Sequence, residues 1–526
     1  MAEADAPPIQ DPTTQQTPLL SMQGISKSFP GVKANDSVEF EVRAGEVHAL
    51  LGENGAGKTT LMNILYGLYQ PDAGEIRYRG EVVTFRSPRD AIACGLGLVA
   101  QHFHLARRHT VAENIALGLA NTPFIFPTRA LRERLRALGD HYGLGVNPDA
   151  RVWQLSPGER QRVEILKALI QGAEILILDE PTSVLTPQEA EALFQVVEQM
   201  TSESKAVIFI SHKLDEVMRI ADTISILRKG AVVGRLKRRD ANPARLAELM
   251  VGRTIAPPER TSDGLRDRIV LELKGVWVRG DRGIDALKEA SFRLRSGEIL
   301  GVAGVAGNGQ AELIEVLTGL RQPSRGQILL DGEDITPLGV RGLFEAGVAH
   351  IPEDRNHVGI VPGMSVAENL VMRQYRYPPF ARGALLDQKQ VTRFARSSID
   401  QYDIATPSKD TPSRLLSGGN VQKVILAREL SGDPKLVVAS HPTYGLDVSA
   451  AALTHELMLS QRARGAGVLL VSEDLDELMQ LSNRILVLFA GQVMGTVDVE
   501  EATSETLGMM MAGAPQEAAL GATTDA

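Results

Sequence analysis

The sequence contains a single cysteine, Cys94, so no disulfide bond can form within the chain. One cysteine in a chain of this size fits a reducing compartment. No run of about 18 apolar residues occurs, which excludes a typical membrane-spanning helix within the chain itself. Basic residues are fewer than acidic ones, so the net charge is −9 and the sequence pI is about 5.7. This balance argues against a general nucleic-acid binder, which normally carries a basic face.

Both ends of the chain lack the patterns of folded or targeted segments. Residues 1–18 are acidic and rich in Pro, Thr and Gln, without the basic and apolar regions of a secretory signal. We therefore expect a disordered tail there. The alanine-rich residues 513–526 predict a second disordered tail.

What the sequence does contain is an internal repeat. The segment GEVHALLGENGAGKTTL, which begins at Gly45, has a counterpart in GEILGVAGVAGNGQAEL, which begins at Gly297. QLSPGERQRVEILKAL, ILILDEPTSVLT and VIFISHKLDEV are followed in the same order by LLSGGNVQKVILAREL, LVVASHPTYGLD and VLLVSEDLDEL, at nearly constant spacing. Such repetition indicates a duplicated domain. We predict one domain over residues 19–252 and a second over residues 269–512, joined by a polar linker at 253–268.

Each half alternates between strand-like and helix-like patterns. Short apolar runs at residues 46–51, 175–178 and 206–210 are typical of buried parallel strands. The fold class predicted for both halves is therefore α/β. More helical insertions are expected at about residues 102–152 and 355–412.

The segment GENGAGKT fits the phosphate-binding pattern G-x-x-x-x-G-K-[ST], between a strand pattern and a helix pattern. Glycines let backbone N–H groups surround phosphate oxygens, and the following helix directs its positive end at them. Lys58 supplies a charge to the β- and γ-phosphates, and Thr59 offers a hydroxyl to Mg²⁺. A glycine-rich turn without a ligand is the alternative. The predicted nucleotide contacts are Gly52, Glu53, Asn54, Gly55, Ala56, Gly57, Lys58, Thr59 and Thr60.

Further polar residues follow strand patterns later in the first half. Asp179 and Glu180 end an apolar strand, where Asp179 can hold Mg²⁺ and Glu180 can polarise the attacking water. A solvated strand end is the alternative. His212 can contact the γ-phosphate, and Gln101 is assigned both to Mg²⁺ and to the reaction. Phe29 either stacks on adenine or belongs to the core.

These motifs in this order resemble the ATP-binding-cassette transporter ATPases: a phosphate loop, Gln101, an LSGG-type signature, LDEP and SH. The resemblance covers residues 19 to about 513 in two copies and implies two tandem ABC-type P-loop NTPase domains. The fused arrangement is similar to the ATPase subunit of bacterial importers for sugars and nucleosides. Four segments resemble the nucleoside branch, which uses basic-membrane-protein-type receptors: AQHF (100–103), VEILKAL (163–169), LTPQEAE (185–191) and IPEDR (351–355).

The resemblance implies a membrane complex. Its expected parts are two integral membrane permease subunits and a substrate-binding lipoprotein on the outside, with no nucleic acid. The chain itself would lie peripherally on the cytoplasmic face of the inner membrane. A monosaccharide importer of the ribose or galactose type is the alternative function. A soluble twin-cassette translation factor is a further one, but it would keep both sites catalytic and carry a long charged linker.

In the family that this chain resembles, two cassettes pair head to tail, and each ATP lies between the phosphate loop of one and the signature of the other. The second half lacks the catalytic side chains: Gln310, Ala311, Ser440, His441 and Glu473 replace Lys58, Thr59, Asp179, Glu180 and His212. Each lost electrostatic contact of this kind commonly costs about 2.7–4 kcal/mol of transition-state stabilisation. The second loop keeps its glycines, so we expect it to bind ATP without hydrolysing it.

The signatures differ in the opposite way to the phosphate loops: the second is intact and the first is altered. The second is intact, at Ser417, Gly418, Gly419 and Asn420, and these residues are predicted to contact the nucleotide. The first contains Pro157, which has no N–H and adds bulk, and Glu159, which adds negative charge. The intact loop therefore pairs with the intact signature when the two halves of one chain close on each other. We predict a single hydrolytic site that binds ATP and Mg²⁺.

Overall fold

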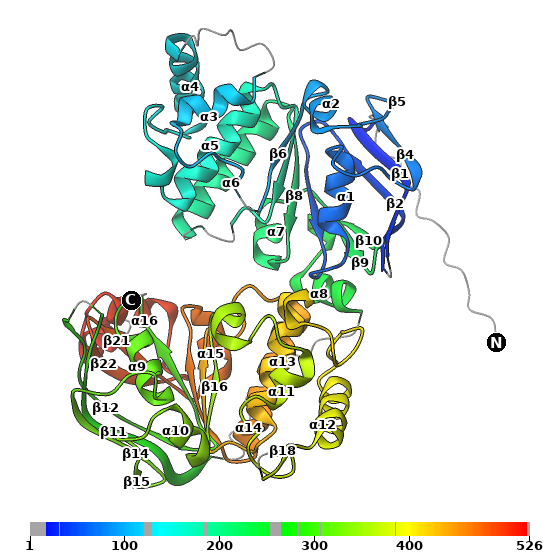
Figure 1. The fold of residues 1–526 in the computed structure, drawn as a ribbon. Coiled ribbons are helices and arrows are strands. Elements are labelled where there is room, and N and C mark those ends of the chain that lie inside the picture. The colour runs from blue at the N-terminus through cyan, green and yellow to red at the C-terminus, as the bar shows by residue number, and fades with distance from the viewer. Residues whose placement is uncertain are drawn as a thin grey trace. The chain divides into compact units, whose positions relative to one another are not determined.

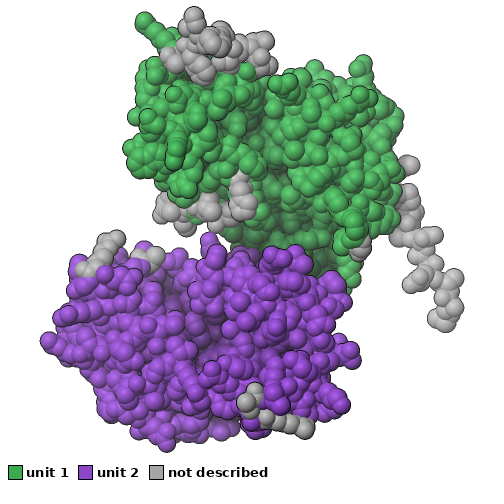
Figure 2. Space-filling model, viewed as in Figure 1, with its two compact units in different colours: residues 1–255 green, residues 256–526 purple. Residues whose placement is uncertain are grey.

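The computed structural model describes residues 17–30, 32–101, 103–119, 128–182, 185, 187–252, 265–281, 283–305, 307–383 and 385–522. The chain forms two compact units, Met1–Ile255 and Ala256–Ala526 (Figure 2). Residues 1–16 of the tail expected at the N-terminus and most of the expected linker lie outside the described residues. The strand β11 begins at Arg266, inside the range expected for the linker.

The first unit is built on a six-stranded sheet with the strand order β10-β9-β3-β8-β7-β6 (Figure 1). All neighbours pair in parallel except β10, which is antiparallel to β9. Every residue of β3, β7 and β8 is buried, which explains why these strands are continuous apolar runs. The strands are β3 Val47–Leu51, β6 Leu96–Val99, β7 Ile175–Asp179, β8 Ala206–Ser211, β9 Thr223–Arg228 and β10 Ala231–Lys237.

A four-stranded antiparallel sheet, ordered β2-β1-β4-β5, lies beside the six-stranded one and is an addition to the predicted fold. Its strands are β1 Leu20–Phe29, β2 Val32–Val42, β4 Ala73–Tyr78 and β5 Glu81–Val83. Helix α1 (Lys58–Leu65) packs between the two sheets, where Leu61 and Leu65 share one core with side chains of both (Figure 1). This packing fixes the direction of α1 and the position of its first turn.

The other helices of the first unit flank the six-stranded sheet. The insertion predicted at 102–152 is helical as expected, with α3 Val111–Leu117, α4 Thr128–Tyr142 and the 3₁₀ turn Val152–Gln154. The remaining elements are α2 Pro88–Ala93, α5 Pro157–Ile170, α6 Pro187–Ser202, α7 Leu214–Ile220, the 3₁₀ turn Arg238–Asp240 and α8 Pro243–Val251.

The second unit repeats both sheets, in the orders β12-β11-β14-β15 and β16-β19-β20-β13-β21-β22. The strands are β11 Arg266–Arg279, β12 Asp285–Ser296, β13 Ile299–Ala303, β14 Arg325–Leu330, β15 Glu333–Asp334, β16 Val348–Ile351, β19 Leu436–Ser440, β20 Gly467–Val471, β21 Arg484–Phe489 and β22 Gln492–Asp498. Each occupies the place of its counterpart in the first unit, which confirms the duplication. A short hairpin, β17 Ala381–Arg382 with β18 Leu385–Leu386, lies in the insertion.

Helices of the second unit follow the same plan. They are α9 Gln310–Thr318, α10 Val340–Ala346, the π-helical turn Arg355–Gly359, α11 Val366–Val371, α12 Gln388–Gln401, the 3₁₀ turn Ser413–Leu415, α13 Gly418–Leu430, α14 Val448–Ala463, α15 Leu475–Leu481 and α16 Ser504–Met511. No helix within the described ranges combines the length and apolarity needed to cross a bilayer.

The predicted disorder of residues 513–526 is wrong for the described part of that segment. Helix α17 spans Gln516–Ala522. The Gln516 side chain accepts a hydrogen bond from the Thr496 N–H at 3.2 Å and donates to the Thr496 carbonyl at 3.1 Å. Ala519 is fully buried in the core beneath α16 and β22. Small alanine side chains allow this close docking, whereas composition alone suggested disorder.

Candidate nucleotide-binding and catalytic site

The phosphate-loop segment connects β3 to α1, and two of its glycines have left-handed backbones, with φ of 84° at Gly55 and 103° at Gly57. A Cβ atom at Gly57 would lie 2.1 Å from the Ala34 carbonyl oxygen, and one at Gly52 would lie 2.4 Å from the Leu227 carbonyl oxygen. Any side chain at these two positions would therefore displace backbone. A Cβ atom at Gly55 would meet nothing within 4 Å. The loop thus presents bare backbone on that side.

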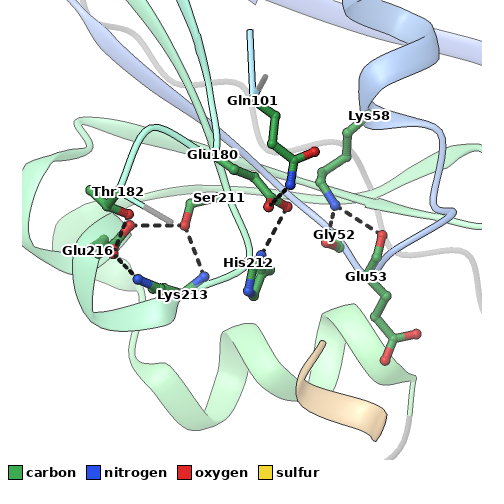
Figure 3. Close-up of polar contacts among 10 residues, drawn as sticks. All are labelled: Gly52, Glu53, Lys58, Gln101, Glu180, Thr182, Ser211, His212, Lys213 and Glu216. Carbon is green, nitrogen blue, oxygen red and sulfur yellow. Dashed lines mark hydrogen bonds and ion pairs between the residues drawn. The ribbon is translucent and has the colours of Figure 1, made fainter. Parts of the chain in front are cut away.

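Lys58, the first residue of α1, is 6% exposed, and its ammonium group lies over the loop (Figure 3). Nζ donates to the Gly52 carbonyl oxygen at 2.5 Å and to the Glu53 carbonyl oxygen at 3.0 Å. The first turn of α1 contains no acidic residue. The lysine charge and the positive end of the helix dipole therefore add at one place, as an anion site requires.

Two side chains from neighbouring strand ends contact Glu180 (Figure 3). Gln101, which follows β6, donates from Nε2 to Glu180 Oε2 at 2.9 Å. His212, which follows β8, lies with Nδ1 3.0 Å from Glu180 Oε1. Because a carboxylate only accepts, Nδ1 must carry the hydrogen in this contact. The three residues that the sequence assigned to the reaction are thus brought together by β6, β7 and β8.

The pKa values of the two neighbouring acids at the end of β7 are shifted in opposite directions. Burial, and then the charge of Glu180, raises the pKa of Asp179 to about 6, against the opposing effect of Lys58. Burial also tends to raise the pKa of Glu180, but the hydrogen bond and charge of His212, with Lys58 and Lys213, hold it below its ordinary value. Glu180 is therefore ionised at neutral pH, whereas the buried Asp179 charge is poorly compensated by the protein alone.

The donor set near Lys58 fits a hard divalent cation. The candidate ligands are the Thr59 hydroxyl, the Asp179 carboxylate and the Gln101 amide oxygen, and Mg²⁺ prefers oxygen ligands of this kind. A cation beside Asp179 would also compensate its buried charge. Phe29, at the end of β1, is 38% exposed and meets Tyr69 edge-on at 5.5 Å between ring centroids. It lies at the surface rather than in the core.

Comparison with known proteins identifies both units. The family model described as ABC transporter matches residues 35–183 and, separately, residues 287–444. The chain belongs to the ABC transporter family. The expected pair of ABC ATPase cassettes is thereby confirmed, and each unit is called a cassette from here on.

Similar proteins cover nearly the whole chain. The guanosine import ATP-binding protein NupO of Bacillus subtilis is 45% identical over 95% of this chain and 98% of its own length. The glucose import ATP-binding protein TsgD13 of Haloferax volcanii is 44% identical over 94% of this chain and 96% of its own. A chain in the crystal structure of archaeal ribosome recycling factor aABCE1 with stalk protein aP1 aligns with a TM-score of 0.60, over 90% of both chains. At 18% identity, that likeness shows the fold alone.

The second cassette keeps the backbone of the site but not its chemistry. Gly307 and Gly309 have φ of 87° and 104°, as in the first loop. Gln310 replaces the lysine; its Nε2 donates to the Val305 carbonyl oxygen at 3.1 Å, and its Oε1 accepts from the Asn308 N–H at 3.1 Å. The Gln310 side-chain amide is neutral, and its oxygen accepts a hydrogen bond from a backbone N–H of the loop. It therefore offers no cation for a phosphate.

The residue at the position of Glu180 also differs between the cassettes. His441 stands where Glu180 does and keeps the left-handed backbone, with φ of 41° compared with 48°. It faces Glu353, whose Oε2 lies 3.5 Å from His441 Nδ1, whereas Glu180 faces Gln101 in the first cassette. The second cassette therefore has an imidazole, and not a carboxylate, at this position.

The two signature helices begin differently. In α5, Ser156 and Glu159 cap each other: Ser156 Oγ accepts from the Glu159 N–H at 3.2 Å, and Glu159 Oε2 accepts from the Ser156 N–H at 2.8 Å. In α13, Ser417 makes no side-chain cap to the backbone, and its Oγ instead accepts from Asn420 Nδ2 at 2.9 Å. The first signature therefore closes its own helix end with a carboxylate, while the second presents its helix end without one.

A part-buried carboxylate that the sequence motifs did not predict lies beside the site. Glu216 Oε1 accepts from Thr182 Oγ1 at 2.6 Å, and Oε2 accepts from Ser211 Oγ at 3.2 Å (Figure 3). The signal for this group was available in the repeat, since the second cassette has the same residue types in the same places. They are Thr443, Ser472 and Glu477.

Proposed function

We propose that this chain is the ATP-hydrolysing subunit of an ABC importer and that only one of its two nucleotide sites turns over. The observation that carries the proposal is the Glu180 carboxylate held between Gln101 and His212 beside Lys58. In the second cassette, Gln310 and His441 stand at the positions of Lys58 and Glu180. A carboxylate with a lowered pKa, positioned near a cationic phosphate loop, suits general-base activation of water.

The proposed roles follow the contacts of the first cassette. The loop amides and Lys58 bind the phosphates, Thr59, Asp179 and Gln101 hold Mg²⁺, and Phe29 stacks on adenine. Mg²⁺ supplies charge neutralisation on the phosphate oxygens when it is bound. Glu180 takes a proton from the attacking water, and the His212 side chain keeps the carboxylate in place. His212 is also a candidate contact of the γ-phosphate.

We further propose that the first loop works with the second signature when the two cassettes of one chain close head to tail. Support comes from the exposed end of α13, where Ser417, Gly418 and Asn420 carry no acidic cap. The first signature would place Glu159 near the phosphates of the other site, where a carboxylate is repelled. The second loop retains its left-handed glycines, so in this proposal it binds ATP without hydrolysing it.

For the substrate we propose nucleosides, with a monosaccharide as the second candidate. NupO, whose name describes guanosine import, and the four segments that resemble the nucleoside branch support the first. TsgD13, named for glucose import, supports the second. The proposed partners are two integral membrane permease subunits and a substrate-binding lipoprotein that acts through them. The chain would then lie peripherally on the cytoplasmic face of the inner membrane.

The one-site proposal is tested by steady-state ATP hydrolysis of the full chain with Mg²⁺. Lys58→Ala should abolish turnover, and Gln310→Lys should leave it nearly unchanged, because the second site lacks its base and its Mg²⁺ ligands. Loss of turnover in Gln310→Lys, with normal turnover in Lys58→Ala, would refute the assignment of the two sites. Nucleotide bound to Glu180→Gln should approach two molecules per chain if the second loop also binds ATP.

The substrate is tested by transport in vesicles that contain the complete permease complex. Radiolabelled guanosine and other nucleosides should accumulate in an ATP-dependent manner, while ribose and glucose should not. Accumulation of the sugars alone would replace the nucleoside proposal with the monosaccharide one.

A further inference from the structure

Glu180 and His212, the groups proposed for hydrolysis, lie on two different loops. Glu216 of helix α7 forms a bridge between these loops through two hydrogen bonds. Glu180 lies on the loop after β7, and His212 lies on the loop after β8. The Thr182 hydroxyl, two residues beyond the base, donates to Glu216 Oε1 at 2.6 Å. The Ser211 hydroxyl, immediately before His212, donates to Glu216 Oε2 at 3.2 Å (Figure 3).

The two hydroxyl groups that Glu216 bridges are buried, and a lysine pairs with the carboxylate. Thr182 and Ser211 are 4% and 3% exposed, and the Glu216 side chain is 13% exposed. Lys213 forms an ion pair with Glu216 Oε1 at 3.0 Å, and its backbone N–H donates to Ser211 Oγ at 3.0 Å. Hydrogen bonds to an ionised acceptor are roughly twice as strong as neutral ones. Glu216 therefore fixes the residues on both sides of His212 and the loop that follows Glu180.

Glu180 needs such support because its backbone is strained. Its φ of 48° is unusual for a residue with a Cβ atom, and such conformations persist only where the surroundings enforce them. The Glu180 N–H donates to the Ile210 carbonyl oxygen at 2.9 Å, which joins the same two strands. The Thr182–Glu216 hydrogen bond is a side-chain contact that holds the residues after Glu180 in this turn.

The second cassette contains the same bridge around a position that has lost its base. Thr443 donates to Glu477 Oε1 at 2.6 Å, and Ser472 donates to Glu477 Oε2 at 2.7 Å. There the turn holds His441, also with a positive φ. The two hydroxyl-to-carboxylate hydrogen bonds are therefore shared by both turns, although Glu477 pairs with His455 (Nε2 to Oε1, 3.0 Å) and not with a lysine.

We propose that Glu216 is a positioning residue for ATP hydrolysis, which holds the Glu180 loop and the His212 loop at a fixed separation through Thr182 and Ser211. This inference rests on the proposed function of Glu180 and His212. Glu216 hydrogen-bonds to neither of these two side chains, so its effect passes through the two hydroxyl groups. The second cassette supplies a control with the same bridge and no base to position.

The test removes single hydroxyl groups and measures steady-state hydrolysis by the full chain. Thr182→Val should lower kcat roughly 10- to 100-fold, the range expected for a misplaced catalytic group, with KM for ATP changed less than about threefold. Thr182→Ser keeps the donor and should stay within about threefold of the parent. Thr443→Val, the matched change in the second cassette, should also stay within about threefold. Thermal unfolding checks that each variant is folded, and Thr182→Ala replaces Thr182→Val if the latter does not fold.

A double substitution separates positioning from independent damage. The Thr182 hydroxyl and the Glu216 carboxylate act as one unit in this proposal, so Thr182→Val with Glu216→Gln should be no slower than the slower single variant. Multiplied losses in the double variant would overturn the proposal. So would a normal kcat in Thr182→Val, or an equal fall in Thr443→Val. Normal turnover in Glu180→Gln would instead refute the proposed function itself, and the two failures are thus distinguishable.

Discussion

Replacement of Asp179 by asparagine should stabilise the first cassette and weaken its response to Mg²⁺ and ATP. Asp179 is 8% exposed at the end of β7. Burial, and then the Glu180 charge, raises its pKa from 3.8 to about 6. Asparagine has nearly the same shape and carries no charge, so it removes the cost of the buried carboxylate without opening a cavity.

The sign and size of the effect follow from that pKa. Because the folded-state pKa lies above the unfolded value, the ionised Asp179 destabilises the fold fully above about pH 6. The penalty declines as the pH falls from about 6 towards 3.8 and is absent below 3.8. The difference corresponds to about 3 kcal/mol at about 1.4 kcal/mol per pKa unit. Asp179→Asn should therefore gain about 3 kcal/mol at pH 8 and about half of that at pH 5.

Hydrogen exchange in increasing urea, followed on peptides from β3 and β7, measures the stability of the first cassette separately from the second. The measurement is made first with a chelator and no nucleotide, and then with Mg²⁺ and ATP. Bound ligand should stabilise the parent chain much more than Asp179→Asn, because the cation compensates the carboxylate charge. Equal or lower stability of Asp179→Asn at pH 8 with chelator, or a gain that does not change with pH, would refute the reasoning.

Three further predictions concern other parts of the chain. Gly418→Pro should lower ATP turnover at least tenfold, because it puts a bulky ring on the second signature. Pro157→Gly in the first signature should leave kcat within about twofold. Equal effects of the two variants in steady-state assays would contradict the head-to-tail proposal. Phe29→Ala should raise the Kd for ATP about tenfold by removing a stacking surface, as equilibrium binding can measure, and an unchanged Kd would place adenine elsewhere. Ala519→Asp should lower the free energy of unfolding of the second cassette by about 2–3 kcal/mol in urea, because it buries a charge under α17; an unchanged value would mean that this helix contributes little.

Several features of this protein could be derived from the sequence alone because their signals are local. A continuous apolar run at 175–178 predicts a buried parallel strand, and the GENGAGKT spacing predicts a loop with a helix after it. Comparison of one half with the other revealed the duplication and the substitution of Lys58 by Gln310. These conclusions need only residue types and their order.

Tertiary structure decided what depends on residues far apart in the chain. Gln101, Glu180 and His212 meet because β6, β7 and β8 are neighbours in a parallel sheet and end at one edge, and local periodicity does not specify that order. The bridge through Glu216, the antiparallel sheet over α1 and the docking of α17 likewise arise from long-range packing. A side chain's burial and the charges around it are properties of the folded chain, so the raised pKa of Asp179 could only be obtained from the three-dimensional arrangement.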